Sequence, residues 1–145
     1  MNNKGFTLIE LLAVIVILAI IALIATPIIL DLIADAREQA KKRSAELVYT
    51  GVQYAYTSAL YAETEDTEIG EPDADAILGK FSVENASAIK DGENIKVTTN
   101  DKVYCLVTIS GTGSSYDVKV SCGDDDDFTG TKYVNGKSVV TGLAE

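Results

Sequence analysis

The N-terminal stretch of the chain reads MNNKGFTLIE over residues 1–10 and LLAVIVILAIIALIATPIIL over residues 11–30. The second block contains no charged residue. Twenty helical residues, each rising 1.5 Å, span about 30 Å, which is the thickness of the hydrocarbon core of a bilayer. Because apolar residues occupy every face, we expect this helix to lie in lipid or in a fully buried site, and not on one side of a soluble core.

The charges that flank the apolar block predict its orientation in a membrane. Lys4 and the amino terminus precede the block, whereas Asp31 and Asp35 follow it. The positive-inside rule then puts the short N-terminal tip in the cytoplasm and the rest of the chain outside. The block is too long for the core of an ordinary cleaved secretory signal, and no convincing small-x-small cleavage site follows it.

Glu10 is the one carboxylate at the start of this apolar run, and no cation stands beside it in the sequence. A charged side chain at the centre of a bilayer costs roughly 2.5–3.5 kcal/mol on insertion scales, and the cost is lower near the end of a span. Such a residue usually has a partner that the single chain does not show. The positive end of the helix dipole also favours an acid at this position.

The segment from Lys4 to Glu10, KGFTLIE, resembles the processing site of type IV prepilins and pseudopilins. The resemblance implies that a prepilin peptidase in the membrane cuts between Gly5 and Phe6 and that the new terminal Phe6 is then N-methylated. It also implies that Glu10 pairs with the free amine of Phe6 in a neighbouring subunit of a filament. Opposite charges in a low-dielectric core attract strongly, and each relieves the burial of the other.

Pro27 matches the helix-interrupting proline that this family has in the same span. A proline removes one backbone hydrogen bond and usually bends the helix axis. It can therefore direct the outer helix toward a globular domain, or mark where the helix loosens in a filament, and both alternatives stay open. The family commonly has a glycine where this chain has Ala19, which weakens the expectation that the helix melts between these positions on assembly.

Beyond residue 30 the helical period continues, but only one face stays apolar. The apolar residues that recur at steps of three, four or seven are Ile33, Ala36, Ala40, Leu47, Val48, Val52, Ala55, Tyr56, Ala59 and Leu60. This pattern predicts an amphipathic helix that covers a small domain and ends near Glu63. Gly51 weakens it by about 1 kcal/mol relative to alanine without ending it.

A basic cluster of Arg37, Lys41, Lys42 and Arg43 lies on the polar side of this helix. We interpret it as a solvated face. The alternatives are pairing with acidic faces of neighbouring subunits and binding of anionic lipid or nucleic acid.

The C-terminal half of the chain has the pattern of an antiparallel sheet. The expected strands are 95–99, 102–109 and 116–122. Asn100-Asp101 is a two-residue hairpin signal, residues 110–115 form a second turn, and Asn135-Gly136 suits the type I′ turn of a further hairpin. A helical turn from Asp73 to Leu78 and an early strand at Phe81 and Val83 precede this sheet of three or four strands.

The two cysteines test the register of the central hairpin. If Cys105 opposes Cys122, then Val107 opposes Val120 and Ile109 opposes Val118, so that every pair is apolar and on one face. A slip by one residue would break all of these pairs at once. The register supports a disulfide on the core side, and the outward topology permits oxidation. Two buried free thiols are the alternative.

The run of Asp124, Asp125, Asp126 and Asp127 is a candidate for binding Ca²⁺, which takes six to eight oxygen ligands. The spacing differs from that of an EF-hand, and four acids in a surface loop are usually just solvated. Calcium is the one candidate cofactor, and it is a low-ranked one.

The composition excludes several classes of function. The chain has no histidine, so that neither a histidine general base nor a Ser-His-Asp triad can be built, and zinc and P-loop spacings are absent. The net charge is −10, with 22 acidic and 12 basic residues, which does not favour nucleic acid as a partner. We therefore predict a protein that is not an enzyme.

These patterns predict an α+β fold, in which a long N-terminal helix packs on a small antiparallel sheet. The expected segments are a leader (1–5), a transmembrane and filament-core helix (6–30), an amphipathic helix (31–63), a variable loop (64–79) and a globular head (80–145). The resemblance implies a homo-oligomeric type IV pilus filament at the cell surface, with this chain as a major pilin. A pseudopilin of a secretion or competence machine and a monomeric, membrane-anchored surface module are the alternatives.

Overall fold

The computed structural model describes residues 5–62, 72–112, 115–128 and 130–142. The elements in chain order are α1 (Leu8–Ala62), α2 (Ala74–Lys80), β1 (Ala86–Asp91), β2 (Asn94–Thr99), β3 (Tyr104–Thr112), β4 (Ser115–Gly123) and β5 (Val134–Thr141). The chain divides into two units, with the boundary between Gln39 and Ala40 inside α1. Half of the expected loop (64–79), residues 64–71, lies outside the described residues.

The first unit contains the N-terminal part of α1. The helix continues without interruption through Pro27, and Thr26 Oγ1 donates a hydrogen bond of 2.6 Å to the carbonyl oxygen of Ala22 in the turn before it. This segment is long and apolar enough to cross a membrane, and none of it is buried. A bend at Pro27 remains a prediction.

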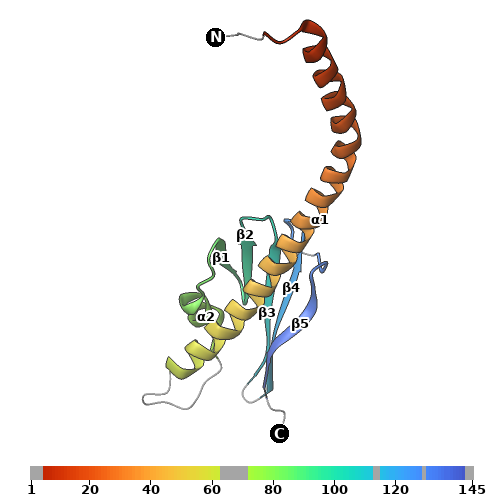
Figure 1. Cartoon of the computed structure of the whole chain (residues 1–145). Helices are drawn as coiled ribbons and strands as arrows, with labels where there is room; N and C mark the ends of the chain where they lie inside the picture. The colour runs from red at the N-terminus through yellow and green to blue at the C-terminus, as the bar shows by residue number, and fades with distance from the viewer. Residues whose placement is uncertain (1–4, 63–71, 113–114, 129, 143–145) are drawn as a thin grey trace. The chain divides into compact units, whose positions relative to one another are not determined.

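The second unit is an antiparallel sheet of five strands in the order β1-β2-β3-β4-β5, and the C-terminal part of α1 lies across one face of it (Figure 1). The short helix α2 lies near the β1 edge. The predicted α+β class, with a long helix packed on an antiparallel sheet, is confirmed.

The core of the second unit forms where one stripe of α1 meets the inner face of the sheet. The stripe consists of Ala45, Val48, Val52, Ala55, Tyr56 and Ala59, all at most 2% exposed. The strands contribute mainly valines to the same cluster. The predicted stripe was wrong at Ile33 and Leu47, which are 42% and 58% exposed. Burial begins only at Ala45, and the predicted stripe residues Ala36 and Ala40 are exposed as well.

The register of the central hairpin agrees with the prediction. Cys105 opposes Cys122, Val107 opposes Val120, Ile109 opposes Val118 and Gly111 opposes Tyr116. The first two of these pairs, together with Val118, are fully buried. The alternation of buried and exposed side chains, with period two, therefore determined the pairing.

Two predicted hairpin turns differ from the structure. The connection from β2 to β3 has four residues, not two: the N–H of Thr99 donates to the carbonyl of Val103 at 3.0 Å, and Lys102 has a φ of 58°. Asn135 and Gly136 lie inside β5 and form no turn. The register shifts opposite them, between Val120 and Cys122, and Gly136 has a φ of 53°. The Asn-Gly pair therefore supplies the positive φ of a β-bulge.

The first strand was not predicted. Phe81 and Val83 form no strand: Phe81 caps the end of α2, and β1 begins only at Ala86. A two-residue turn with Gly92 at a φ of 66° joins β1 to β2. The helical turn expected from Asp73 is α2, and the Asp73 side chain accepts a hydrogen bond of 2.8 Å from the N–H of Ala76.

Gly51 has a packing role that its low helix propensity does not reveal. A Cβ atom added at Gly51 would lie 2.2 Å from Val83 Cγ2, a side chain of the segment that follows α2. Carbon atoms in van der Waals contact are about 3.5–4.0 Å apart. The glycine therefore allows this segment to approach α1 closely.

We expect Gly51→Ala to destabilise the protein by about 1–3 kcal/mol, because the clash outweighs the gain in helix propensity. Gly79→Ala in α2 is the matched control, since a Cβ there meets nothing within 4 Å. This control should gain about 0.4–1 kcal/mol. Urea unfolding of the full chain in detergent, followed by circular dichroism, compares the two. Equal stabilisation of both variants would contradict the packing role.

Candidate functional site

Gly5, Phe6 and Thr7 precede the first residue of α1 and have no helical structure. All three are exposed, and the Phe6 side chain is 87% exposed. The N–H of Leu11 donates to the carbonyl of Thr7 at 3.3 Å, which closes the first turn. Thr7 is therefore the N-cap of the helix.

Thr7 and Glu10 form a capping box. The N–H and the Oγ1 hydroxyl of Thr7 donate to Glu10 Oε2 at 2.9 and 2.8 Å, and the N–H of Glu10 donates to Thr7 Oγ1 at 3.3 Å. This is the reciprocal pattern of a Thr-x-x-Glu sequence at the start of a helix. Glu10 thus has a partner within its own chain, which the sequence reasoning missed although the signature was present. Both bonds to the carboxylate use Oε2, so that Oε1 points to no partner among the described residues.

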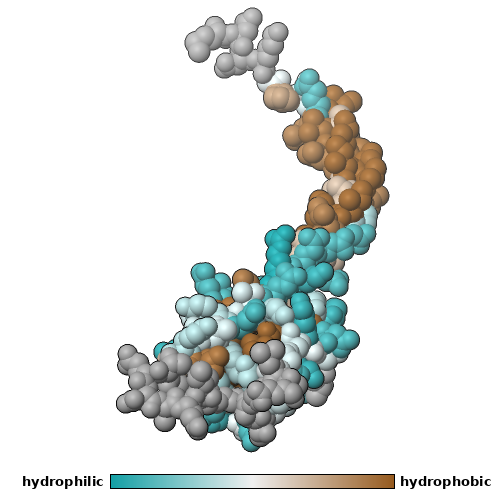
Figure 2. All heavy atoms as spheres, turned by 90° about the horizontal axis from the view of Figure 1, so that it is seen from below, coloured by the Kyte–Doolittle hydropathy of each residue, from teal (hydrophilic) through white to brown (hydrophobic). Residues whose placement is uncertain are grey.

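The helix behind this cap presents apolar side chains on all sides. Every large apolar side chain from Phe6 to Leu30 is between 48% and 87% exposed. Figure 2 shows the resulting apolar surface along this part of α1. At about 25 cal/mol per Å² of apolar surface, such exposure to water is strongly unfavourable. The surface therefore requires lipid or protein around it.

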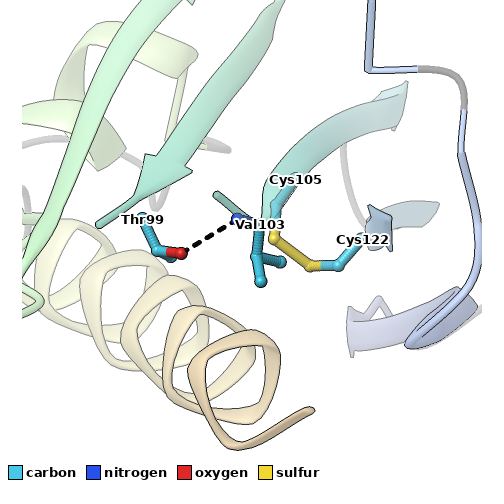
Figure 3. Close-up of a disulfide and its surroundings, with 4 residues drawn as sticks. All are labelled: Thr99, Val103, Cys105 and Cys122. Atoms are coloured by element: carbon cyan, nitrogen blue, oxygen red, sulfur yellow. Dashed lines mark hydrogen bonds between the residues drawn. A yellow bond between two sulfur atoms is a disulfide. The ribbon is translucent and has the colours of Figure 1, made fainter. Parts of the chain in front are cut away.

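The predicted disulfide is present in the second unit. Cys105 and Cys122 lie on neighbouring strands with Cα atoms 4.1 Å apart, and both side chains are fully buried. Figure 3 shows the bridge beside the end of β2, where the N–H of Val103 donates to Thr99 Oγ1 at 3.2 Å. This bond satisfies the buried hydroxyl of Thr99. The bridge joins the two strands at the helix-facing side of the sheet.

The aspartate run begins directly after β4, and its first member is neutralised by cations of the same chain. Asp124 Oδ1 accepts from Lys41 Nζ of α1 at 2.6 Å, and Oδ2 accepts from Lys132 Nζ at 3.0 Å. The hydroxyl of Tyr133 donates to Oδ1 at 2.9 Å. These hydrogen bonds, that from Lys41 foremost, lower the pKa of Asp124 to about 2 and raise the pKa of Lys41. Lys41 is therefore not simply a solvated residue of the basic cluster.

The described residues include no group of three or more acidic or thiol side chains that could hold a metal ion. Asp124 uses both of its oxygens for lysines, and Asp125 accepts the N–H of Phe128 with its backbone carbonyl at 3.1 Å. Calcium binding by the run from Asp124 to Asp127 stays a prediction. It requires the carboxylates to rearrange, because Asp124 is bound to two cations.

A comparison with protein families matched residues 1–26 to the prokaryotic N-terminal methylation motif. Comparisons with curated proteins and with solved structures found no significant match. The matched segment contains Gly5, Phe6 and Glu10 and continues into the exposed apolar part of α1.

The motif is a class III signal, which defines a class of membrane-anchored subunits that are processed at their N-terminus. This match supports a likeness to type IV pilin-like proteins, and the long apolar helix packed on a sheet domain is a pilin-like arrangement. This class comprises pilus subunits and pseudopilins, whose role is structural. The resemblance inferred from residues 4–10 is thereby confirmed.

The pKa of Asp124 predicts a pH dependence of stability. The pKa is below the ordinary value, so its ion pairs stabilise the fold above about pH 4, and this contribution is lost as the pH falls to about 2. Because the pair is partly exposed, we expect Asp124→Asn to cost only about 0.5–1 kcal/mol at pH 7. Urea unfolding at pH 7 and pH 2 measures the difference, which should shrink at pH 2. Asp126→Asn is the control and should be neutral at both pH values.

Removal of the disulfide should destabilise the second unit. The bridge closes a loop with a sequence separation of 17 residues, for which the chain-entropy model gives about 3 kcal/mol. We expect the double variant Cys105→Ala with Cys122→Ala to lose stability on this scale and to be insensitive to reductant. The wild type should fall to a similar stability when reduced. Unfolding curves with and without dithiothreitol test this, and an unchanged wild type would contradict it.

Proposed function

We propose that this protein is the major subunit of a type IV pilus. The chain is inserted in the cytoplasmic membrane with its N-terminal tip inside, and a prepilin peptidase removes residues 1–5. Phe6 is then methylated, and identical subunits assemble through their N-terminal helices into a filament at the cell surface. The observation that carries this proposal is the helix from Leu8 to Leu30, which is apolar and exposed on every side.

The exposed surface supports assembly because lipid and other copies of the same helix can cover it in turn. In the membrane, lipid chains surround the helix, whereas in a filament each helix packs among its neighbours. Small residues such as Ala13, Ala19 and Ala22 occur along it and permit close approach of helices. The head, with its disulfide and acidic surface, then forms the outer shell.

Glu10 supports the proposal through the geometry of its carboxylate. Oε2 accepts both hydrogen bonds from Thr7, which leaves Oε1 for the amine of Phe6 in a neighbouring subunit. A cation delivered to this oxygen would neutralise a charge that is costly in an apolar core. The capping box holds the side chain at the helix start, where an incoming amine can reach it.

The first experiment is the intact mass of the protein in sheared surface material of producing cells. A chain that begins at Phe6 and carries one added methyl group, found in the sheared fraction, supports the pilus subunit. Processed protein that stays in the envelope in short assemblies favours a pseudopilin. Full-length protein confined to membranes overturns the proposal and favours an anchored surface module.

The assembly role of Glu10 is tested with Glu10→Gln. Glutamine can also close a capping box, so this variant removes the charge and keeps the helix start. We expect normal cleavage after Gly5 but at least a tenfold loss of sheared filaments, because the amine of Phe6 loses its counter-charge. Asp35→Asn, outside the apolar run, is the matched control and should form filaments normally. Filaments at wild-type yield from Glu10→Gln would refute the pairing.

A further inference from the structure

The capping box of Thr7 and Glu10 decides where α1 begins, and this boundary lies two residues after the bond between Gly5 and Phe6. In the structure, the first carbonyl that accepts a helical hydrogen bond is that of Thr7. The carbonyl of Gly5 therefore belongs to non-helical, exposed chain. That carbonyl is the group that a peptidase must attack.

A longer helix would compete with the capping box for the same donors. In an α-helix each N–H bonds to the carbonyl four residues earlier. If α1 extended toward the N-terminus, the N–H of Glu10 would turn from Thr7 Oγ1 to the carbonyl of Phe6. The N–H of Ile9 would then bond to the carbonyl of Gly5, and the bond to be cut would become part of the helix.

The competition is strong at this place because first-turn N–H groups have no partner within the helix. No water satisfies such donors where a helix start enters the hydrocarbon core of a bilayer, so that there either the box or a longer helix must do so. The box supplies the Thr7 hydroxyl for one of these donors, and Glu10 in return accepts the N–H of Thr7. Substitution of an N-cap threonine by alanine typically costs about 1 kcal/mol.

We propose that Thr7 is a positioning residue for leader removal, and that its capping box keeps the Gly5 carbonyl outside the helix and open to the peptidase. This inference rests on the proposed processing after Gly5. In that step water adds its hydroxyl to the Gly5 carbonyl carbon, the peptide bond to Phe6 breaks, and a proton passes to the Phe6 nitrogen. Thr7 takes no part in this chemistry. It sets the conformation in which the bond is presented.

The test is the rate of cleavage of the full chain in detergent by a purified prepilin peptidase, followed by intact mass. Thr7→Val keeps the shape of the side chain but lacks the hydroxyl, and Thr7→Ser keeps the hydroxyl. We expect kcat/KM to fall about fivefold for Thr7→Val, the factor that corresponds to ~1 kcal/mol, and to stay near the wild-type value for Thr7→Ser. Glu10→Gln, which can close the same box, should also be cut at close to the wild-type rate.

The matched control is Thr26→Val. Thr26 is also an exposed threonine, but it lies inside α1, where its hydroxyl donates to the carbonyl of Ala22 and caps no helix end. This variant should be cleaved like the wild type. A second readout is the carbonyl ¹³C shift of Gly5, measured by NMR on the uncleaved chain. It should move toward helical values in Thr7→Val and not in Thr7→Ser.

The outcomes separate this inference from the proposed function. A wild-type chain that is not cut between Gly5 and Phe6 overturns the proposed processing itself. A wild-type chain that is cut there, with Thr7→Val cut equally fast, overturns the positioning role alone. An equal fall of kcat/KM for Thr7→Val and Thr7→Ser, with no change in the Gly5 carbonyl shift, also overturns the positioning role. The peptidase would then recognise the threonine side chain by direct contact.

Discussion

The contact between one stripe of α1 and the inner face of the sheet holds the second unit together. Three of the six residues of the stripe are alanines, so that the strands can approach the helix closely, and Tyr56 fills the wider space beside Tyr116, with ring centroids 5.3 Å apart. In the same way, the absence of a side chain at Gly51 lets the segment after α2 approach the helix closely. Polar links flank this contact: Tyr49 donates to the carbonyl of Ser138, Ser44 donates to the carboxylate of Asp101, and Lys41 pairs with Asp124.

The two parts of α1 differ in how their apolar side chains are covered. From Ala45 onward only one face is apolar, and the chain itself covers it. Before Leu30 every face is apolar, and none of the described residues of the chain buries it. The apolar surface of an isolated chain therefore requires lipid or other protein around it. The apolar helix behind the methylation motif needs neighbours, and the proposed filament supplies them.

The sequence predicted best the features that depend on hydrophobic periodicity or on residues paired across strands. The all-round apolar run predicted the helix, the amphipathic stripe predicted the fold class, and the apolar pairs that follow from Cys105 opposite Cys122 predicted the register. The bounds of the stripe were less certain, since Leu47 fits the helical period yet faces solvent. Periodicity shows which residues share a face, but not where the sheet begins to cover it.

Weaker signals failed for identifiable reasons. β1 is rich in alanine and serine, which have little strand preference, and it forms because β2 provides its hydrogen bonds. Gly136 of the Asn-Gly pair has a positive φ, which serves a bulge as well as a turn, and here β5 pairs with β4 on both sides of the two residues. At the N-terminus, the charge of Glu10 drew attention to partners in other chains. The nearer partner, Thr7, was visible in the spacing Thr-x-x-Glu.

The position of the disulfide also has a mechanical consequence. It ties β3 to β4, the central and fourth strands of the sheet, at a sequence separation of 17 residues. When tension is applied to the two ends of the chain, the force passes through the sulfur–sulfur bond and bypasses that loop. At ~3.4 Å per extended residue, an unravelled head would lengthen by roughly 60 Å less than a chain without the bond. In the proposed filament, the oxidised head would thus limit how far a stretched fibre can extend by unfolding its subunits.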